Sequence, residues 1–106
     1  MGNNIQRISG MLGFARKTGK TVIGTEMVCR MMPKNGFIKL VVISGGASDS
    51  TKKKLTVKCD FYKIPSVVAE IDTEALASLL GKSGAVAAVA VTDDRFAEEI
   101  RKATAR

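Results

Sequence analysis

Apolar side chains recur every three or four positions in five stretches of the chain, a spacing that places them on one face of a helix. The predicted helices carry their apolar faces at Ile5, Ile8, Leu12 and Ala15; at Val28, Met31 and Met32; at Leu55, Cys59 and Tyr62; at Leu76, Leu79 and Leu80; and at Phe96, Ile100 and Ala103. Residues that favour helix starts precede four of these stretches, namely Asn3 or Asn4, Ser48 or Asp49, Asp72, and Thr92 or Asp93. Helix ends are expected at Gly19, before Pro33 and at Gly81.

Three nearly continuous apolar runs alternate with these helices and predict short strands at residues 38–43, 66–69 and 85–91. Residues 20–23 are expected to form only a short link between the first two helices. This alternation favours an α/β fold, a three-layer α/β/α sandwich around a small mixed, mostly parallel sheet. The length of 106 residues fits a single domain that spans residues 1–106.

The charge of the chain is basic and unevenly distributed, with 17 Lys and Arg against 10 Asp and Glu and a net charge of +7. Residues 1–64 hold 12 basic and 3 acidic side chains, net +9, whereas residues 65–106 hold 5 basic and 7 acidic ones, net −2. One electropositive face that suits a polyanionic partner is therefore expected, and a merely soluble basic surface is the alternative. The sequence shows no run of about 20 apolar residues and no secretory leader pattern, so we expect no membrane partner and a cytoplasmic location.

Residue types suited to catalysis or metal binding are scarce. The chain has no histidine, and its two cysteines, Cys29 and Cys59, fall within predicted helices, where they are expected to be buried as small apolar side chains. The paired carboxylates near the last helix are sequence neighbours, which do not face one another on a helix. Two Gly-Lys segments lack the earlier glycine of a phosphate-binding loop, since Phe14 and Leu76 stand there. We therefore expect no enzymatic activity, no metal and no cofactor.

The start of the second predicted helix groups residue types that suit RNA. Free amides and the positive end of the helix dipole attract phosphates there, and polar side chains reach base edges. Lys52 and Lys53 on the third helix are expected to add phosphate contacts, and the amides of Gly45 and Gly46 are candidates for another. With one tyrosine and four phenylalanines, base stacking on a sheet is disfavoured and recognition of a folded RNA shape is expected. The candidates at the second helix are Lys20, Gly24, Thr25, Glu26 and Arg30.

Six stretches of the chain follow one another in a specific order and spacing. They are Ile-Ser-Gly-Met-Leu-Gly-Phe-Ala-Arg-Lys at 8–17, Gly-Thr-Glu at 24–26, Lys-Leu-Val-Val-Ile at 39–43, Asp-Ser-Thr-Lys-Lys-Lys-Leu at 49–55, Tyr-Lys-Ile-Pro at 62–65 and Val-Thr-Asp-Asp-Arg-Phe-Ala at 91–97. Together they resemble the kink-turn RNA-binding ribosomal protein superfamily, of the large-subunit ribosomal protein seven-Ae and thirty-e type. Within it, the chain is similar to the short bacterial YlxQ-like members, essentially from end to end.

The resemblance implies that the chain binds a kink-turn, an RNA helix bent sharply at a bulge beside tandem sheared G·A pairs. In the family, a Gly-x-Asn-Glu-x-x-Lys stretch at the start of the second helix enters the groove at those pairs, and residues 24–30 stand in its place here. Gly24 and the basic Arg30 match, but Glu26 replaces the asparagine and Met27 the glutamate. An ionised Glu26 cannot donate a hydrogen bond, and Met27 has no carboxylate to accept one from guanine.

The resemblance implies two further RNA contacts. Lys20 stands where the family has a phosphate-binding lysine before the second helix. The family also covers an extruded nucleotide with an apolar loop before the final strand. Residues 81–86 correspond to that loop, and Lys82, Ser83 and Gly84 make it more polar here.

The leading hypothesis is a non-catalytic protein that binds kink-turn or similarly structured RNA, in ribosomal RNA or an mRNA leader, without DNA specificity. The ribosome and RNA-modifying enzymes are the further partners considered. The runner-up is a protein-interaction module of the same fold that has lost kink-turn recognition, as Glu26 and Met27 permit. A third hypothesis is a substrate-binding accessory to a separate RNA-modifying enzyme.

Overall fold

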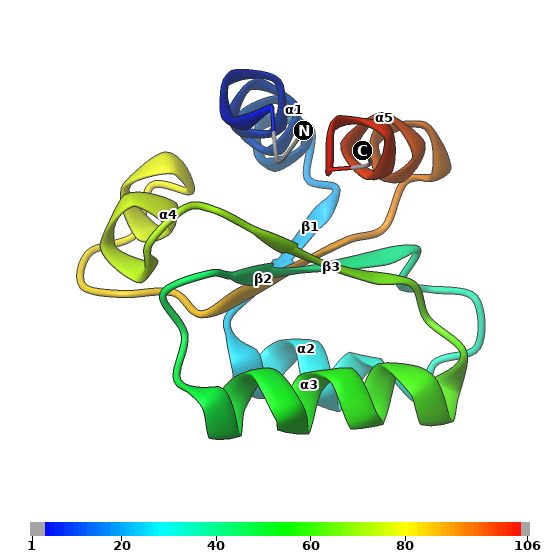
Figure 1. Cartoon of the computed structure of the whole chain (residues 1–106). Helices are drawn as coiled ribbons and strands as arrows, with labels where there is room; N and C mark the ends of the chain where they lie inside the picture. The colour runs from blue at the N-terminus through cyan, green and yellow to red at the C-terminus, as the bar shows by residue number, and fades with distance from the viewer. Residues whose placement is uncertain (1–3, 105–106) are drawn as a thin grey trace.

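Five helices enclose a four-stranded sheet in the computed structural model, which describes residues 4–104 (Figure 1). The helices are α1 (Ile5–Lys17), α2 (Thr25–Met31), α3 (Asp49–Tyr62), α4 (Thr73–Leu79) and α5 (Asp94–Thr104), and the strands are β1 (Thr21–Ile23), β2 (Leu40–Ser44), β3 (Ser66–Ala69) and β4 (Ala88–Val91). Helices α1, α4 and α5 cover one face of the sheet, and α2 and α3 cover the other. The predicted three-layer α/β/α sandwich is confirmed.

The sheet has the strand order β1-β4-β2-β3. β1 and β2 both run antiparallel to β4, and only the β2 and β3 pair is parallel. The mixed sheet is confirmed, but the expectation that most of it is parallel is wrong. The difference arises because β4 runs antiparallel to β2, and because residues 20–23, expected to form a link, contain β1, which also pairs antiparallel with β4.

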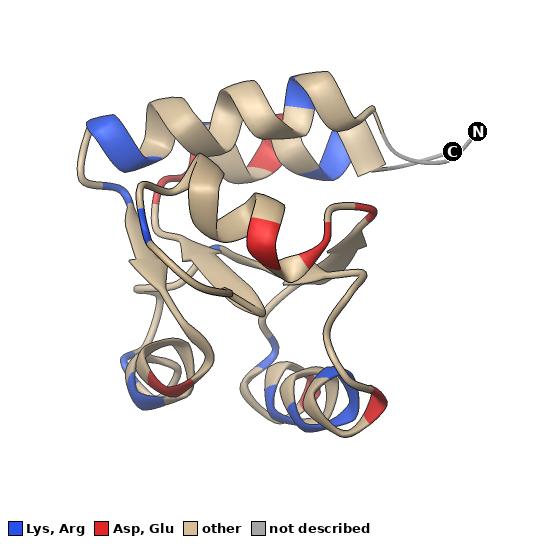
Figure 2. Ribbon diagram, turned by 90° about the vertical axis from the view of Figure 1, so that its left-hand side faces the viewer, with Lys and Arg blue, Asp and Glu red and all other residues tan. Residues whose placement is uncertain are grey.

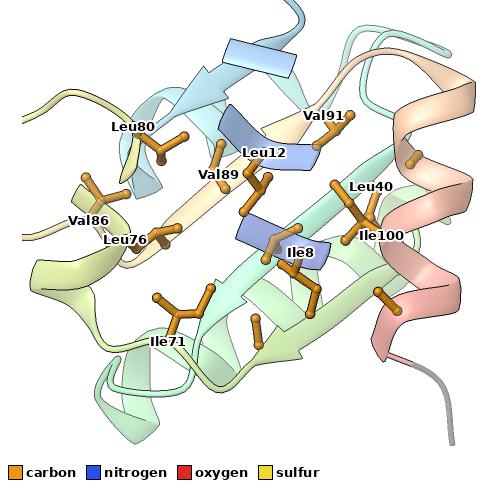
Figure 3. Close-up of a cluster of buried hydrophobic side chains, with 14 of the residues drawn as sticks. Ile8, Leu12, Leu40, Ile71, Leu76, Leu80, Val86, Val89, Val91 and Ile100 are labelled. Carbon is orange, nitrogen blue, oxygen red and sulfur yellow. The ribbon is translucent and has the colours of Figure 1, made fainter. Parts of the chain in front are cut away.

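Side chains that alternate along the two central strands, β2 and β4, point into two separate hydrophobic cores. Leu40 and Val42 of β2 point into the core beneath α1, α4 and α5 (Figure 3), and Val41 and Ile43 point into the core above α2 and α3. All five residues of β2 are buried, as its nearly continuous apolar run predicts. The sheet is therefore rigidly held from both sides, and its strand ends present the loops at two opposite rims.

Side-chain caps begin the helices where the sequence predicts them. Asn4, Ser48, Asp72 and Asp93 each accept a hydrogen bond from a backbone amide three residues on, at 2.8–3.2 Å. Asn3, the other cap candidate for α1, lies outside the described residues. Two strand boundaries differ from the prediction, since β2 spans Leu40–Ser44 rather than 38–43 and β4 begins at Ala88 rather than at 85.

Helix α3 ends at a lysine in the left-handed conformation. Lys63 has φ 58° and ψ 43°, and the next amide, of Ile64, donates to the Cys59 carbonyl at 2.8 Å. Residues other than glycine are strained in this backbone conformation. We expect Lys63→Gly to raise the free energy of unfolding by about 0.5 to 1 kcal/mol, which a urea titration would measure. The control Lys58→Gly, inside the helix, should lower it by about 1 kcal/mol, and a loss in both variants would contradict the strain.

The two cysteines differ in burial. Cys59 is buried in the core above α2 and α3, as predicted, whereas Cys29 is only half-buried beside that core. Burial, with a smaller contribution from the Asp60 carboxylate, raises the pKa of the Cys59 thiol from 9.0 to about 11.

The raised pKa of Cys59 makes stability depend on alkaline pH. The folded pKa lies above the unfolded one, so the thiol stabilises the fold below about pH 9, and this contribution is lost as pH rises toward 11. We expect urea unfolding of the wild type to lose more free energy across this range than that of a Cys59→Ala variant. Parallel losses in the two proteins would show that the thiol titrates normally when folded.

Candidate nucleic-acid interface

One rim of the sheet brings together segments that are far apart in the sequence. The amide of Gly24, after β1, donates to the Ala88 carbonyl at the start of β4 at 2.9 Å, and the amide of Ser44 donates to the Ala87 carbonyl at 2.8 Å. The starts of α2 and α3 and the segment before β4 therefore share this rim, at the left of Figure 1. We call it the near rim, defined by residues 24–30, 45–53 and 81–87.

The first turn of α2 forms the exposed centre of the near rim. Gly24 caps this helix without a side-chain hydrogen bond and has φ 100°, a conformation that other residues rarely adopt. Glu26 and Arg30 are exposed, Thr25 is half-buried and Met27 is 43 % exposed. The Arg30 guanidinium lies 3.9 Å from the Met27 sulfur, so the cation and the thioether form one surface.

The segment before β4 provides the second part of the near rim. Lys82, Ser83 and Gly84 are all exposed, and the Val86 amide anchors the segment by donating to the Thr73 carbonyl at 3.0 Å. A Cβ atom at Gly81 would overlap the guanidinium of Arg16, which therefore lies over the start of this segment. Sequence reasoning missed Arg16 as a site residue, because nothing in the pattern shows that the end of α1 packs beside α4.

Gly45 and Gly46 have structural roles that the sequence does not reveal. The Gly45 amide donates to the Ala69 carbonyl at 2.7 Å, and the Gly46 amide donates to the buried Ser44 hydroxyl at 3.0 Å. A Cβ atom at Gly46 would stand 3.2 Å from the Cα of Asp72, so the turn needs a glycine there. Both amides are thus occupied within the chain, and the expectation that they bind a phosphate does not fit this geometry.

The predicted lysines lie at different rims. Lys52 and Lys53 are on the first turn of α3, at the near rim, with Lys52 half-buried and Lys53 exposed. Lys20 lies at the other end of β1, where its carbonyl accepts the Thr92 amide at 3.0 Å. Four residues of extended chain, about 13 Å, separate Lys20 from Gly24, so the structure does not bring this lysine to the start of α2.

Charge is divided across the near rim. Figure 2 looks onto it and shows acidic segments around the start of α4, and both basic and acidic ones on α2 and α3. The acidic residues Glu70, Asp72 and Glu74 follow β3, at the opposite edge of the sheet from β1. The strand order therefore keeps these carboxylates about 14 Å from the α2 start across the sheet.

Residues 6–101 match the sequence model of the ribosomal protein L7Ae/L30e/S12e/Gadd45 family. The chain belongs to this family. Curated relatives named RNA-binding protein YlxQ are 38% identical over 90 residues in Bacillus subtilis (strain 168) and 29% identical over 100 residues in Enterococcus faecium. The first alignment covers 85% of this chain and 87% of the Bacillus relative. The second covers 93% of this chain and 92% of the Enterococcus relative.

Two solved structures share the fold of this chain. A protein of unknown function from Bacillus halodurans C superimposes with a TM-score of 0.83 at 30% identity, covering 92% of this chain and 96% of that one. A Giardia lamblia 15.5kD RNA binding protein superimposes with a TM-score of 0.75 at 16% identity, covering 92% and 85%, which shows a shared fold.

Residues 4–104 contain neither a cluster of metal ligands nor a membrane-spanning helix. Within this range no group of three or more Cys, Asp or Glu side chains is placed to hold a metal ion. None of the helices in this range is long and apolar enough to cross a bilayer.

Proposed function

We propose that this protein is a non-catalytic RNA-binding protein that recognises kink-turn or similarly structured RNA through its near rim. The observation that carries the proposal is the hydrogen bond between Gly24 and Ala88, which ties the exposed first turn of α2 to the start of β4, the strand into which the exposed segment 82–84 leads. Membership of the L7Ae/L30e/S12e/Gadd45 family and the name of the 38% identical relative support RNA as the ligand. Ribosomal RNA or an mRNA leader in the cytoplasm is the proposed target.

In this proposal the near rim binds the bent RNA by charge and shape. Arg30, Arg16 and Lys82 contact phosphates or guanine edges, since a guanidinium offers several donors in one plane. Glu26 accepts from exocyclic amino groups of bases, and Met27 packs against a base or sugar. Because a straight duplex cannot meet both parts of the rim at once, the protein favours the bent state by its differential affinity.

The runner-up is a protein-interaction module of the same fold. It is favoured by one observation, the exposure of Glu26 and of 43 % of Met27 where the family pattern has asparagine and glutamate. A carboxylate beside a thioether suits a partner protein as well as a base edge.

Titration of a kink-turn and a matched straight duplex across 50 to 200 mM salt separates the two functions. We expect the kink-turn to bind at least about tenfold more tightly, which is 1.4 kcal/mol. Arg30→Ala should reduce kink-turn affinity about five- to tenfold, and Lys102→Ala, on exposed α5, should not. Equal binding of both RNAs with a steep salt dependence would leave only a basic surface and overturn the proposal.

A further inference from the structure

The rim opposite the near rim carries a row of basic residues. β1, β2 and β3 begin there and β4 ends there, so the residues before the three starting strands lie along one edge. The Lys20 carbonyl accepts the Thr92 amide at 3.0 Å, and the Lys39 amide donates to the Val91 carbonyl at 2.8 Å. Lys63 lies three positions before Ser66, the first residue of β3. We call this the far rim, defined by residues 17–20, 34–39, 60–65 and 92–95.

Exposed aromatic rings accompany these lysines. Phe37 is 38 % exposed, and the Lys34 ammonium lies 6.0 Å from the centre of its ring. Phe61 is 76 % exposed, so most of its ring is open to solvent, and it meets the Tyr62 ring nearly at a right angle with ring centres 4.9 Å apart. Phe37 lies in the loop before β2 and Phe61 in the last turn of α3, which leads into the neighbouring strand β3, at the right of Figure 1. A ring as exposed as Phe61 adds little to the core.

The acidic residues of the far rim offset only part of its charge. Asp94 pairs with Lys39 at 3.7 Å, and Asp93 accepts the amides of Arg95 and Phe96 as the cap of α5. Asp60 is exposed near the end of α3. Among the ion pairs of residues 4–104, none includes Lys20, Lys34 or Lys63, and all three are exposed.

Lys63 supports a role for this rim beyond solubility. Glycine would adopt the left-handed backbone conformation at position 63 at a lower cost in free energy, yet the chain has a lysine there. Residues held in strained backbone conformations cluster at functional sites.

We propose that the far rim is a second RNA contact, which binds a single-stranded or looped segment. Phe61 and Phe37 stack on bases, and Lys20, Lys34 and Lys63 contact phosphates, the combination that binds single strands without sequence preference. The 14 residues of α3 place the two rims about 21 Å apart, so one protein holds two segments of a folded RNA. This inference rests on the proposed function only in taking RNA as the ligand.

The test uses the full chain and an unstructured oligouridine of about 12 nucleotides, within the site sizes of single-strand binders. Phe61→Ala should weaken oligouridine binding at least about fivefold, the lower limit for one lost stacked base. The control Val57→Ala, one helical turn away and also exposed, should bind like the wild type. Lys34→Gln with Lys63→Gln should reduce the salt slope by about 1.4, or 0.7 for each lost phosphate contact.

The same variants separate the two rims. A kink-turn without single-stranded extensions should bind the wild type and Phe61→Ala equally, whereas an oligouridine extension should raise affinity only for the wild type. Unchanged oligouridine affinity and salt slope in the variants, with wild-type melting curves, would overturn the far-rim proposal. If oligouridine binding depends on Phe61 while kink-turn preference is absent, the far rim stands and the proposed function of the near rim fails. Amide shifts of the wild type confined to residues 24–30 on adding oligouridine would likewise overturn the far rim.

Discussion

The double substitution Glu26→Asn with Met27→Glu is expected to increase kink-turn affinity by about thirtyfold or more, which is 2 kcal/mol. Both side chains are exposed on the first turn of α2, so the exchange leaves the cores intact. An asparagine both donates and accepts hydrogen bonds, and a glutamate at position 27 accepts from a guanine amino group. Each well-aligned base contact contributes about 1 to 3 kcal/mol. Fluorescence titration with a kink-turn would measure the gain.

A control must distinguish base recognition from a change of charge. The double variant keeps one carboxylate in the first turn of α2, so its net charge equals that of the wild type. Binding to a straight duplex should therefore change by less than about twofold, because that affinity depends on phosphate contacts. If kink-turn affinity stays at the wild-type level, the first turn of α2 does not enter the RNA groove. The protein-interaction module then becomes the better reading of the near rim.

Replacing Ile100 by alanine is expected to lower the free energy of unfolding by about 2 to 5 kcal/mol. Ile100 is fully buried and joins α5 to the core beneath α1 and α4 (Figure 3). The loss combines the transfer of the missing methyl groups with the cavity they leave. A melting temperature at least about 8 °C lower should accompany it.

Lys102→Ala provides the matched comparison for Ile100→Ala. Lys102 lies two residues away on the exposed side of α5, so its change should stay within about 0.5 kcal/mol. A cost below about 1 kcal/mol for Ile100→Ala would mean that α5 contributes little to this core.

Hydrophobic spacing locates all the helices described between residues 4 and 104, because each carries a buried face, and a capping residue marks the start of each except α2. The strands are harder to predict. β1 is only three residues long, too short to show alternation, and it becomes a strand by pairing with β4. The apolar residues 85–87 precede β4 and are not part of it, because the Val86 amide donates a hydrogen bond to the carbonyl of Thr73, the first residue of α4. The sheet is less parallel than expected because β4 pairs antiparallel with both β1 and β2.

The candidate site was only partly predictable because side-chain proximity depends on backbone geometry. Lys20 and Gly24 would share one face if the residues between them were helical, but the extended β1 carries them to opposite rims. Gly45 and Gly46 resemble an amide cradle in the sequence, yet β3 and the start of α4 pack against them. The position of Arg16 at the near rim follows only from the packing of α1 beside the end of α4, which the sequence does not show.

The first and last helices of the fold are directly joined. The Asn4 amide donates to the Ala103 carbonyl at 2.9 Å, and Arg7 pairs with Glu99. During translation, α1 therefore leaves the ribosome long before its partner, and its Ile8 and Leu12 side chains stay uncovered until α5 has been made. The core above α2 and α3 needs no residue of α5 and is complete once Ala88 and Ala90 of β4 have been made, so the two sides of the sheet are completed at different moments of synthesis.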